Sequence, residues 1–383
     1  MTKPIRFDEV RGWVFDRALP FWTATVLDAQ GAGVLEQLNL DGSPRDPGFK
    51  RVRTQARQVY SFCHIHLLGW DGPNKAASDT GLEFLKARAA LPGGGWARTL
   101  ARDGTVLDPT IDLYDNAFVI FALAWRQMAF GDADAEALAE ATLDAIEARL
   151  GAPGRGFRAA DPDPGERVQN PHMHLLEASL AWVEATGHDR FRALADELVD
   201  MHLDLFQQGD DGMLAEFFDS DWRPVRGLRG QLAEPGHQYE WAWLLGKAGA
   251  LLGRDLEAPA RRLHGFARSK GHNPATGLCW DVIDRDGAVI KPTSRSWAQT
   301  EWLKAELALG EHWGEFDRDR IAQAVDLLLD KHLAWSPAGT WMDQFDAEGR
   351  PIADHVPCSI LYHVLLAFAE LLRLEERIHE QAG

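Results

Sequence analysis

The chain has 383 residues, of which 45% are hydrophobic and 26% charged, and its formal net charge is −18. This composition favours a globular, cytoplasmic protein, because no apolar run is long enough to span a bilayer and the N-terminus lacks a signal-peptide segment. The charge disfavours nucleic acid and anionic membranes as partners and favours a neutral ligand, and three scattered cysteines exclude a disulfide framework.

Helical periodicity predicts about twelve helices along the chain. The expected ranges are 8–29, 48–69, 75–91, 113–130, 134–150, 171–187, 189–207, 235–252, 256–270, 296–309, 317–332 and 357–377. Long connections precede every second helix, and short ones follow it. Because short helix–helix links are typical of antiparallel neighbours, the pattern predicts six helical hairpins.

A repeated motif lies in the long connections, with a period of about 60 residues. Each copy has a glycine, a few alternating residues and then an Asp-Gly, Glu-Gly or similar turn, which predicts a short β-hairpin. The copies begin at Gly33, Gly95, Gly156, Gly212, Gly277 and Gly339. A sixfold repeat of helix pairs predicts an all-α fold, an (α/α)6 barrel, in one domain over residues 1–383, with the hairpins at its mouth.

Polar and aromatic residues recur near the starts of the even-numbered helices. They include Arg57, Tyr114, Asn170, His174, Glu177, His237, Glu240, Trp297, Glu301 and His363. Parallel inner helices would bring these side chains to one mouth, whereas an open helical solenoid would not need polar residues to converge. We therefore expect one functional site there.

Two of the histidines share a local pattern. In NPHMHLLE, Asn170 can cap a helix and His174 is followed by Glu177; in EPGHQYEW, Pro235 suits the first helical position and His237 is followed by Glu240. A helix N-terminus and partial burial both disfavour imidazolium, so we expect neutral histidines that can act as bases. The two glutamates either orient the rings or close capping interactions.

Each candidate also has a plainer interpretation. Metal binding is disfavoured because His172 and His174, two apart on a helix, point about 200° apart, so we expect no metal. Arg57 either stabilises an anionic oxygen or forms a buried ion pair, and Tyr114 and Trp297 either contact a sugar or belong to the core. The loop cations Arg226, Arg229, Lys291 and Arg295 either bind a phosphate or sulfonate or are solvated.

Several blocks resemble the N-acylglucosamine 2-epimerase family, which includes mannose isomerases and cellobiose 2-epimerases. They are RVRTQARQVY at 51–60, DLYDNAF at 112–118, NPHMHLLEA at 170–178, EPGHQYEWAWLL at 234–245, SWAQTEWLKA at 296–305 and LYH at 361–363. The resemblance implies an (α/α)6 barrel and cofactor-free acid–base chemistry on a reducing monosaccharide. The family's site arginine falls on Arg57, its tyrosine on Tyr114 and its histidines on His174, His237 and His363. The ending PCSILYH resembles the isomerases more than the N-acylglucosamine epimerases.

We therefore expect an aldose–ketose isomerase of the mannose-to-fructose type, acting as a monomer or homodimer. His363 would remove the C2 proton to give a cis-enediolate that Arg57 stabilises, while His174 or His237 assists ring opening. Proton return at C2 by His237 from the opposite face would give 2-epimerisation, which is the first alternative. A glycoside hydrolase using Asp115, Glu240 or Glu301, and a non-catalytic helical scaffold, are the others.

Overall fold

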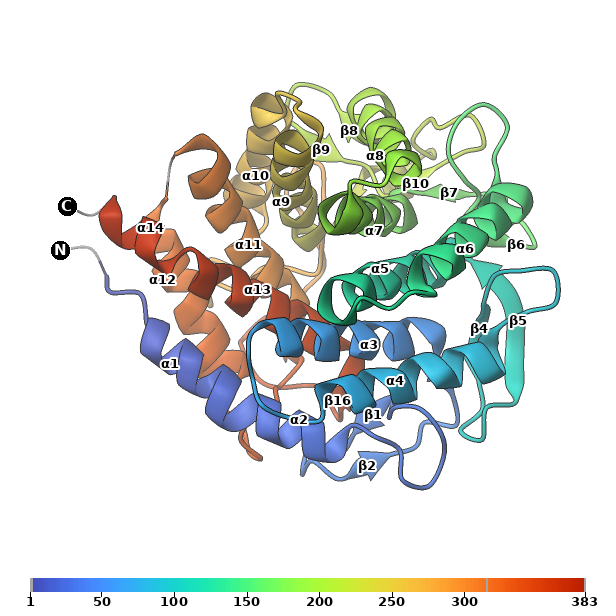
Figure 1. Cartoon of the computed structure of the whole chain (residues 1–383). Helices are drawn as coiled ribbons and strands as arrows, with labels where there is room; N and C mark the ends of the chain where they lie inside the picture. The colour runs from blue at the N-terminus through green and yellow to red at the C-terminus, as the bar shows by residue number, and fades with distance from the viewer. Residues whose placement is uncertain (1–2, 315, 382–383) are drawn as a thin grey trace.

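The computed structural model describes residues 3–314 and 316–381, and helices make up most of it (Figure 1). The helices are α1 (Phe7–Gly12), α2 (Leu19–Thr25), α3 (Val52–Leu67), α4 (Asn74–Phe84), α5 (Leu113–Phe130), α6 (Ala135–Leu150), α7 (Gln169–Thr186), α8 (Asp189–Met201), α9 (Pro235–Leu252), α10 (Glu257–Lys270), α11 (Ser296–Trp313), α12 (Arg318–Leu327), α13 (Leu361–Arg373) and α14 (Glu375–Glu380). A π-helical segment, Trp13–Ala18, joins α1 to α2, and short π-helical segments extend α4, α8 and α12. Each predicted range contains helix, but the range 48–69 starts late because Lys50–Arg51 form a strand.

Six helices form a closed inner ring, namely α3, α5, α7, α9, α11 and α13. Each contacts the next one, and α13 returns to α3, while the helices between them in the chain pack outside the ring (Figure 1). The inner helices are buried on nearly all sides; in α11 burial is continuous from Ser296 to Gly310. This arrangement confirms the predicted (α/α)6 barrel.

Connections of two lengths alternate around the barrel. Residues 131–134 and 187–188 lead from inner to outer helices, whereas 151–168 and 207–234 lead back and carry strands. The long connections therefore gather at the end where the inner helices begin. The single-domain prediction over 1–383 includes residues 1, 2, 315, 382 and 383, which lie outside the described residues, and it stays a prediction.

Short antiparallel strands link neighbouring repeats at this end. They are β1 (Gln37–Leu38), β2 (Pro44–Arg45), β3 (Lys50–Arg51), β4 (Ala97–Leu100), β5 (Val106–Asp112), β6 (Ala160–Asp161), β7 (Arg167–Val168), β8 (Gln207–Gln208), β9 (Met213–Leu214), β10 (Phe217–Phe218), β11 (Leu232–Ala233), β12 (Val282–Asp284), β13 (Val289–Lys291), β14 (Thr293–Arg295), β15 (Gln344–Asp346) and β16 (Val356–Pro357). The pairs β1–β2, β4–β5 and β12–β13 are the first, second and fifth predicted hairpins, and the fourth and sixth are closed by single bridges, Phe218–Pro224 and Phe345–Pro351. Strand β16 pairs with β1, so the last repeat is joined to the first.

The third predicted hairpin is wrong. Strand β6 pairs with β5, and β7 pairs with β10, so both strands bond to neighbouring repeats instead of to each other. Pro162 and Pro164 stand between them and lack the N–H groups that a hairpin ladder needs. The Asp-Pro-Asp-Pro sequence therefore overrides the turn signal of the following Gly165.

The inner helices hold the long connections in place through side chains in their first turns. In repeat after repeat, an amide or imidazole accepts a hydrogen bond from a backbone N–H just after the motif glycine. The acceptors are Gln55, Asn116, His172, Gln238 and Gln299. His172 is thus a structural histidine, with Nε2 accepting from Phe157 N–H at 3.0 Å and Nδ1 donating to the Val168 carbonyl at 2.9 Å.

The tight turn after β10 has a tryptophan at the position of positive φ, where the equivalent turns of other repeats have a glycine. Gly104 has φ 88° and donates its N–H to Ala101 O, and Trp222 has φ 61° and donates to Asp219 O. Among the described residues, Trp222 is the only non-glycine with positive φ. Its ring packs against Phe206 and Phe218 at centroid distances of 5.4 and 5.7 Å, which offsets the backbone strain.

No helix in the part of the chain that the structure describes has the length and apolar character of a membrane span.

Candidate active site

A cavity of about 390 Å³ opens at the end of the barrel where the inner helices start. Its lining includes predicted site residues from α3, α5, α7, α9, α11 and α13: Arg57, Tyr114, Asn170, His174, His237, Glu240, Trp297 and His363. Glu177 and Glu301 do not line it and lie behind histidines instead. The predicted residues therefore do gather at one mouth.

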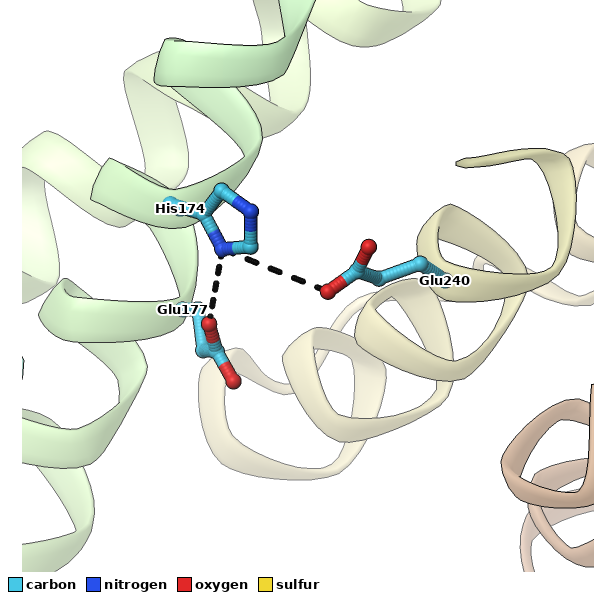
Figure 2. A group of neighbouring side chains, drawn as sticks. All are labelled: His174, Glu177 and Glu240. Carbon is cyan, nitrogen blue, oxygen red and sulfur yellow. Dashed lines mark hydrogen bonds and ion pairs between the residues drawn. The ribbon is translucent and has the colours of Figure 1, made fainter. Parts of the chain in front are cut away.

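His174 and Glu177 lie one turn apart on α7 and form a hydrogen bond, with His174 Nδ1 3.0 Å from Glu177 Oε2 (Figure 2). The hydroxyl of Tyr362 donates to the other oxygen of Glu177, which fixes the carboxylate. Burial lowers the pKa of His174 to about 4, although Glu177 opposes this effect. His174 is therefore neutral, as expected, and its Nε2 is left for the cavity.

Glu240 reaches toward the same histidine from α9, and its Oε1 lies 4.0 Å from His174 Nδ1 (Figure 2). That buried oxygen has no hydrogen-bond partner among the described residues. Burial raises the pKa of Glu240 well above its usual value, and the nearby Glu301 and Glu177 raise it further. Glu240 thus behaves as a neutral acid that can give a proton to a ligand.

The structure corrects the expectation for His237. Its Nδ1 contacts both oxygens of Glu216, at 3.1 and 3.0 Å, and not Glu240. Burial lowers the pKa of His237, but Glu216, which is in contact with the ring, and the nearby Glu234 outweigh burial and raise it to about 9. His237 is therefore an imidazolium near neutral pH, because its surrounding carboxylates favour the charge more than burial and the helix start disfavour it.

His363, in the first turn of α13, has its Nδ1 2.8 Å from Glu301 Oε1. Lys304 Nζ lies 2.6 Å from the other oxygen of Glu301, and both side chains are fully enclosed. Burial, together with the cations Arg57 and Lys304, lowers the pKa of His363 well below its ordinary value. His363 is a neutral imidazole whose Nε2 is available as a base.

Arg57 projects into the cavity from the second turn of α3. It donates to the Tyr114 hydroxyl at 2.7 Å, and its guanidinium lies 4.1 Å from the Phe118 ring centroid and 4.8 Å from that of Tyr362. No carboxylate forms an ion pair with it within residues 3–314 and 316–381. The buried ion pair weighed for Arg57 is thus not observed, and its charge faces the cavity.

Asn170 differs from its expected role as a helix cap. Helix α7 starts at Gln169 and has no side-chain cap, so Asn170 lies inside the first turn. Its Oδ1 is buried without a hydrogen-bond partner among the described residues, while the residue lines the cavity. Trp297 lies between two histidines, with ring centroids 5.1 Å from His237 and 5.9 Å from His363.

Two residues that support the histidines were not predicted from the sequence: Glu216, which contacts His237, and Lys304, which pairs with the carboxylate behind His363. A signal for Glu216 exists: an acidic residue stands three or four places after the motif glycine in several repeats, as Glu36, Glu216, Asp281 and Asp343. Lys304 carries no comparable signal, because a lysine in an apolar helix is usually exposed.

Three groups of side chains have ligand atoms within 4.8 Å of one another: His174 with Glu177 and Glu240, His237 with Glu216 and Glu234, and His363 with Glu240 and Glu301. In each group the Nδ1 atom of the histidine is already bonded to a carboxylate of that group, so this nitrogen is not free for a metal ion. They also lie beside the cations Arg57 and Lys304. The donor set suits proton transfer better than cation binding.

Comparison with known proteins agrees with this geometry. The family described as N-acylglucosamine 2-epimerase (GlcNAc 2-epimerase) matches residues 33–367. The chain belongs to this family. It is accordingly an isomerase or 2-epimerase, as the resemblance implied.

Relatives within the family carry isomerase names. A protein of Rhizobium meliloti (strain 1021) named mannose-6-phosphate isomerase is 36% identical, with 95% of this chain and 96% of the relative covered. A D-mannose isomerase of Thermobifida fusca is 30% identical, with 80% and 84% covered. The crystal structure of a D-mannose isomerase superposes with a TM-score of 0.86 at 22% identity, with 97% of this chain and 100% of that chain covered, and supports the fold alone.

Proposed function

We propose that this enzyme interconverts an aldose and its ketose, in the manner of mannose and fructose, by histidine acid–base catalysis without a metal ion. The observation that carries the proposal is the pairing of a neutral base with an unpaired cation. His363 and Arg57 both contact the ring of Tyr362, at 4.5 and 4.8 Å, and Arg57 has no carboxylate partner among the described residues. A base beside an oxyanion partner suits proton abstraction next to a carbonyl.

The protons balance as follows in the proposed reaction. His237 gives its proton to the ring oxygen while the O1 hydroxyl loses one to His174, which opens the sugar. Nε2 of His363 then removes the C2 proton, and the resulting enediolate is stabilised by Arg57. His363 returns that proton to C1, and the O2 proton passes to O1 through Glu240, which leaves a C2 carbonyl. When the ketose closes its ring, His174 gives its proton to O2 and the ring-closing hydroxyl returns one to His237, so both histidines regain their starting states.

A 2-epimerase is the second candidate, and the charged state of His237 favours it. An imidazolium can deliver a proton to C2 from the face opposite His363 and so invert that carbon. Names of the relatives favour isomerisation, because mannose-6-phosphate and D-mannose isomerases are more similar to this chain than the cellobiose 2-epimerases. A glycoside hydrolase is disfavoured, since of its three candidate carboxylates Glu301 is bonded to His363 and Asp115 accepts the backbone N–H of Arg53, which leaves Glu240 without a second free carboxylate.

The test is incubation with mannose, mannose 6-phosphate and glucose in D2O, followed by NMR. Appearance of the ketose, with deuterium at C1, supports isomerisation. Label confined to C2 of an epimeric aldose, with no ketose, would replace the first candidate by the second. Release of sugar from oligosaccharides alone would contradict both.

A further inference from the structure

The cavity has a cationic wall that the proposed proton transfers do not use. Arg51 and Arg53 line it together with Arg57; Arg51 ends β3 and directly precedes α3, and the other two lie in the first two turns of α3. The side chains of Arg51 and Arg53 are 28% and 26% exposed, so they lie nearer the mouth than the buried Arg57. This wall contrasts with the net charge of −18 over the whole chain.

The spacing of the arginines matches the length of a sugar. Arg53 precedes Arg57 by four residues, which puts it on the same face of α3 and about 6 Å nearer the mouth. An opened hexose with C1 and C2 at Arg57 and His363 would extend its far end along this direction. The last carbon of the sugar then lies beside Arg53.

The charge of Arg53 is only partly offset. Its Nε lies 3.2 Å from Oδ1 of Asp115, but that oxygen already accepts the backbone N–H of Arg53. Among the described residues, no hydrogen bond from the Arg53 guanidinium is found. Burial raises the pKa of Asp115 to about 7, so this partner is not fully ionised near neutral pH.

Arg51 is held more firmly, and its charge is offset by a carboxylate. Its guanidinium pairs with the buried Glu36, at 2.5 Å between NH2 and Oε1. The carboxyl groups that line the cavity do little to cancel these charges. Glu234 is paired with Arg295, and burial raises the pKa of Glu240 and of Asp343, which favours their neutral forms.

Other loop cations do not form this wall. Arg226, Arg229 and Lys291 do not line the cavity, and Arg229 pairs with Glu166 at 2.6 Å. Arg295 does line it, but binds both Asp281 and Glu234. The unused donors therefore concentrate on α3.

We propose that Arg53, supported by Arg51, binds a phosphate or sulfonate on the carbon farthest from the reacting end, so that the preferred substrate is an anionic aldose. This inference rests on the proposed function and replaces the neutral ligand expected from net charge. A planar guanidinium with free donors suits a tetrahedral oxyanion. The positive charge near the cavity determines that the ligand is an anion, because dissolved salt screens the repulsion from distant surface carboxylates.

The experiment compares kcat/KM for mannose with that for mannose 6-phosphate, in the unaltered enzyme and in Arg53→Gln. We expect the phosphorylated sugar to be preferred at least about tenfold, and the ratio to fall about 10- to 100-fold in the variant. Glucose and its 6-sulfonate analogue, assayed in parallel, distinguish phosphate from sulfonate. The matched control is Arg98→Gln, whose arginine pairs with Asp108 and Asp112 outside the cavity and should leave the ratio unchanged.

A second measurement does not need turnover. Calorimetric titration with inorganic phosphate should give saturable binding to the unaltered chain, weakened in Arg53→Gln that folds by circular dichroism. Equal kcat/KM for mannose and mannose 6-phosphate, or phosphate binding unaffected by the substitution, overturns the anion site. Absence of turnover of every sugar together with intact phosphate binding would contradict the proposed isomerase and leave the anion site supported.

Discussion

Lys304 forms an ion pair with Glu301 at 2.6 Å in a place that solvent does not reach. Glu301 in turn bonds Nδ1 of His363, so a fully buried ammonium stands two contacts behind the proposed base. Burial raises the pKa of Glu301, and Lys304 opposes that rise. As long as Glu301 is ionised, it accepts the Nδ1 proton and leaves Nε2 of His363 free.

Replacing Lys304 by Met should therefore impair the proposed base without touching the cavity. Loss of the ammonium favours a proton on Glu301, which would then donate to Nδ1 and place the histidine proton on Nε2. We expect kcat to fall about 10²- to 10³-fold with a smaller change in KM, and the acid limb of the pH profile to move upward. Lys247→Met is the control, because Lys247 pairs with the exposed Glu184. A fall in kcat that is equal in both variants would contradict the positioning role of Lys304.

The charge of His237 should appear in the alkaline limb of kcat/KM. Because the pKa of His237 is raised from 6.5 to about 9, the ring stays protonated over this pH range. Activity that needs the imidazolium is therefore present below pH 9 and is lost as the pH rises through about 9. In Glu216→Gln the strongest source of the rise is gone, and the alkaline limb should move toward 6.5. Glu166→Gln, at a half-buried carboxylate that pairs with Arg229 outside the cavity, should leave the limb unchanged. An unshifted limb in Glu216→Gln would show that another group titrates there.

His363→Asn should remove the group that exchanges the C2 proton. We expect turnover and deuterium incorporation from D2O to fall about 10²- to 10⁴-fold, while sugar binding changes little. NMR in D2O measures both. The matched control is His172→Gln, since Gln238 fills the equivalent hairpin-binding position in the next repeat. If His363→Asn exchanged the C2 proton at the normal rate, His363 would not be the base, and His174 would be assigned that role.

Removal of metal ions should not affect turnover. The Nδ1 atoms of His174 and His363 are bonded to carboxylates, and His237 carries a positive charge that repels a dication. Activity after dialysis against EDTA should match that of the untreated enzyme, and Mn²⁺ or Zn²⁺ should not stimulate it. A loss restored by one of these ions would assign a metal to the group around Glu240.

Two substitutions at Trp222 should measure the energy of backbone strain separately from the energy of side-chain packing. Trp222→Gly removes a buried ring, at a cost of about 3–5 kcal/mol, and relieves left-handed strain of about 1–2 kcal/mol, so we expect a net loss of about 1–4 kcal/mol. Trp222→Ala removes the ring but keeps the strain, and should be less stable than the glycine variant by about 1 kcal/mol. Urea unfolding measures the order. An alanine variant as stable as the glycine variant would show that φ at this position relaxes.

Much of the fold and part of the site were predictable from the sequence by itself. The motif glycines and helical periodicity are local signals, and they were sufficient for the barrel, its mouth and the first-turn residues such as His174, His237 and His363. The prediction of the third hairpin was wrong because Pro162 and Pro164 lack the backbone N–H donors that a hairpin needs. The prediction of Asn170 as a helix cap was wrong because the helix begins at Gln169, two residues before the predicted start.

Only the tertiary structure decided which carboxylate serves which histidine, and hence which histidine is charged. Glu240 is three residues from His237 in sequence, yet Glu216 from a hairpin makes the contact and Glu240 turns toward His174. Electrostatic energies depend on distances and burial across the ring of helices, and a linear spacing contains neither quantity.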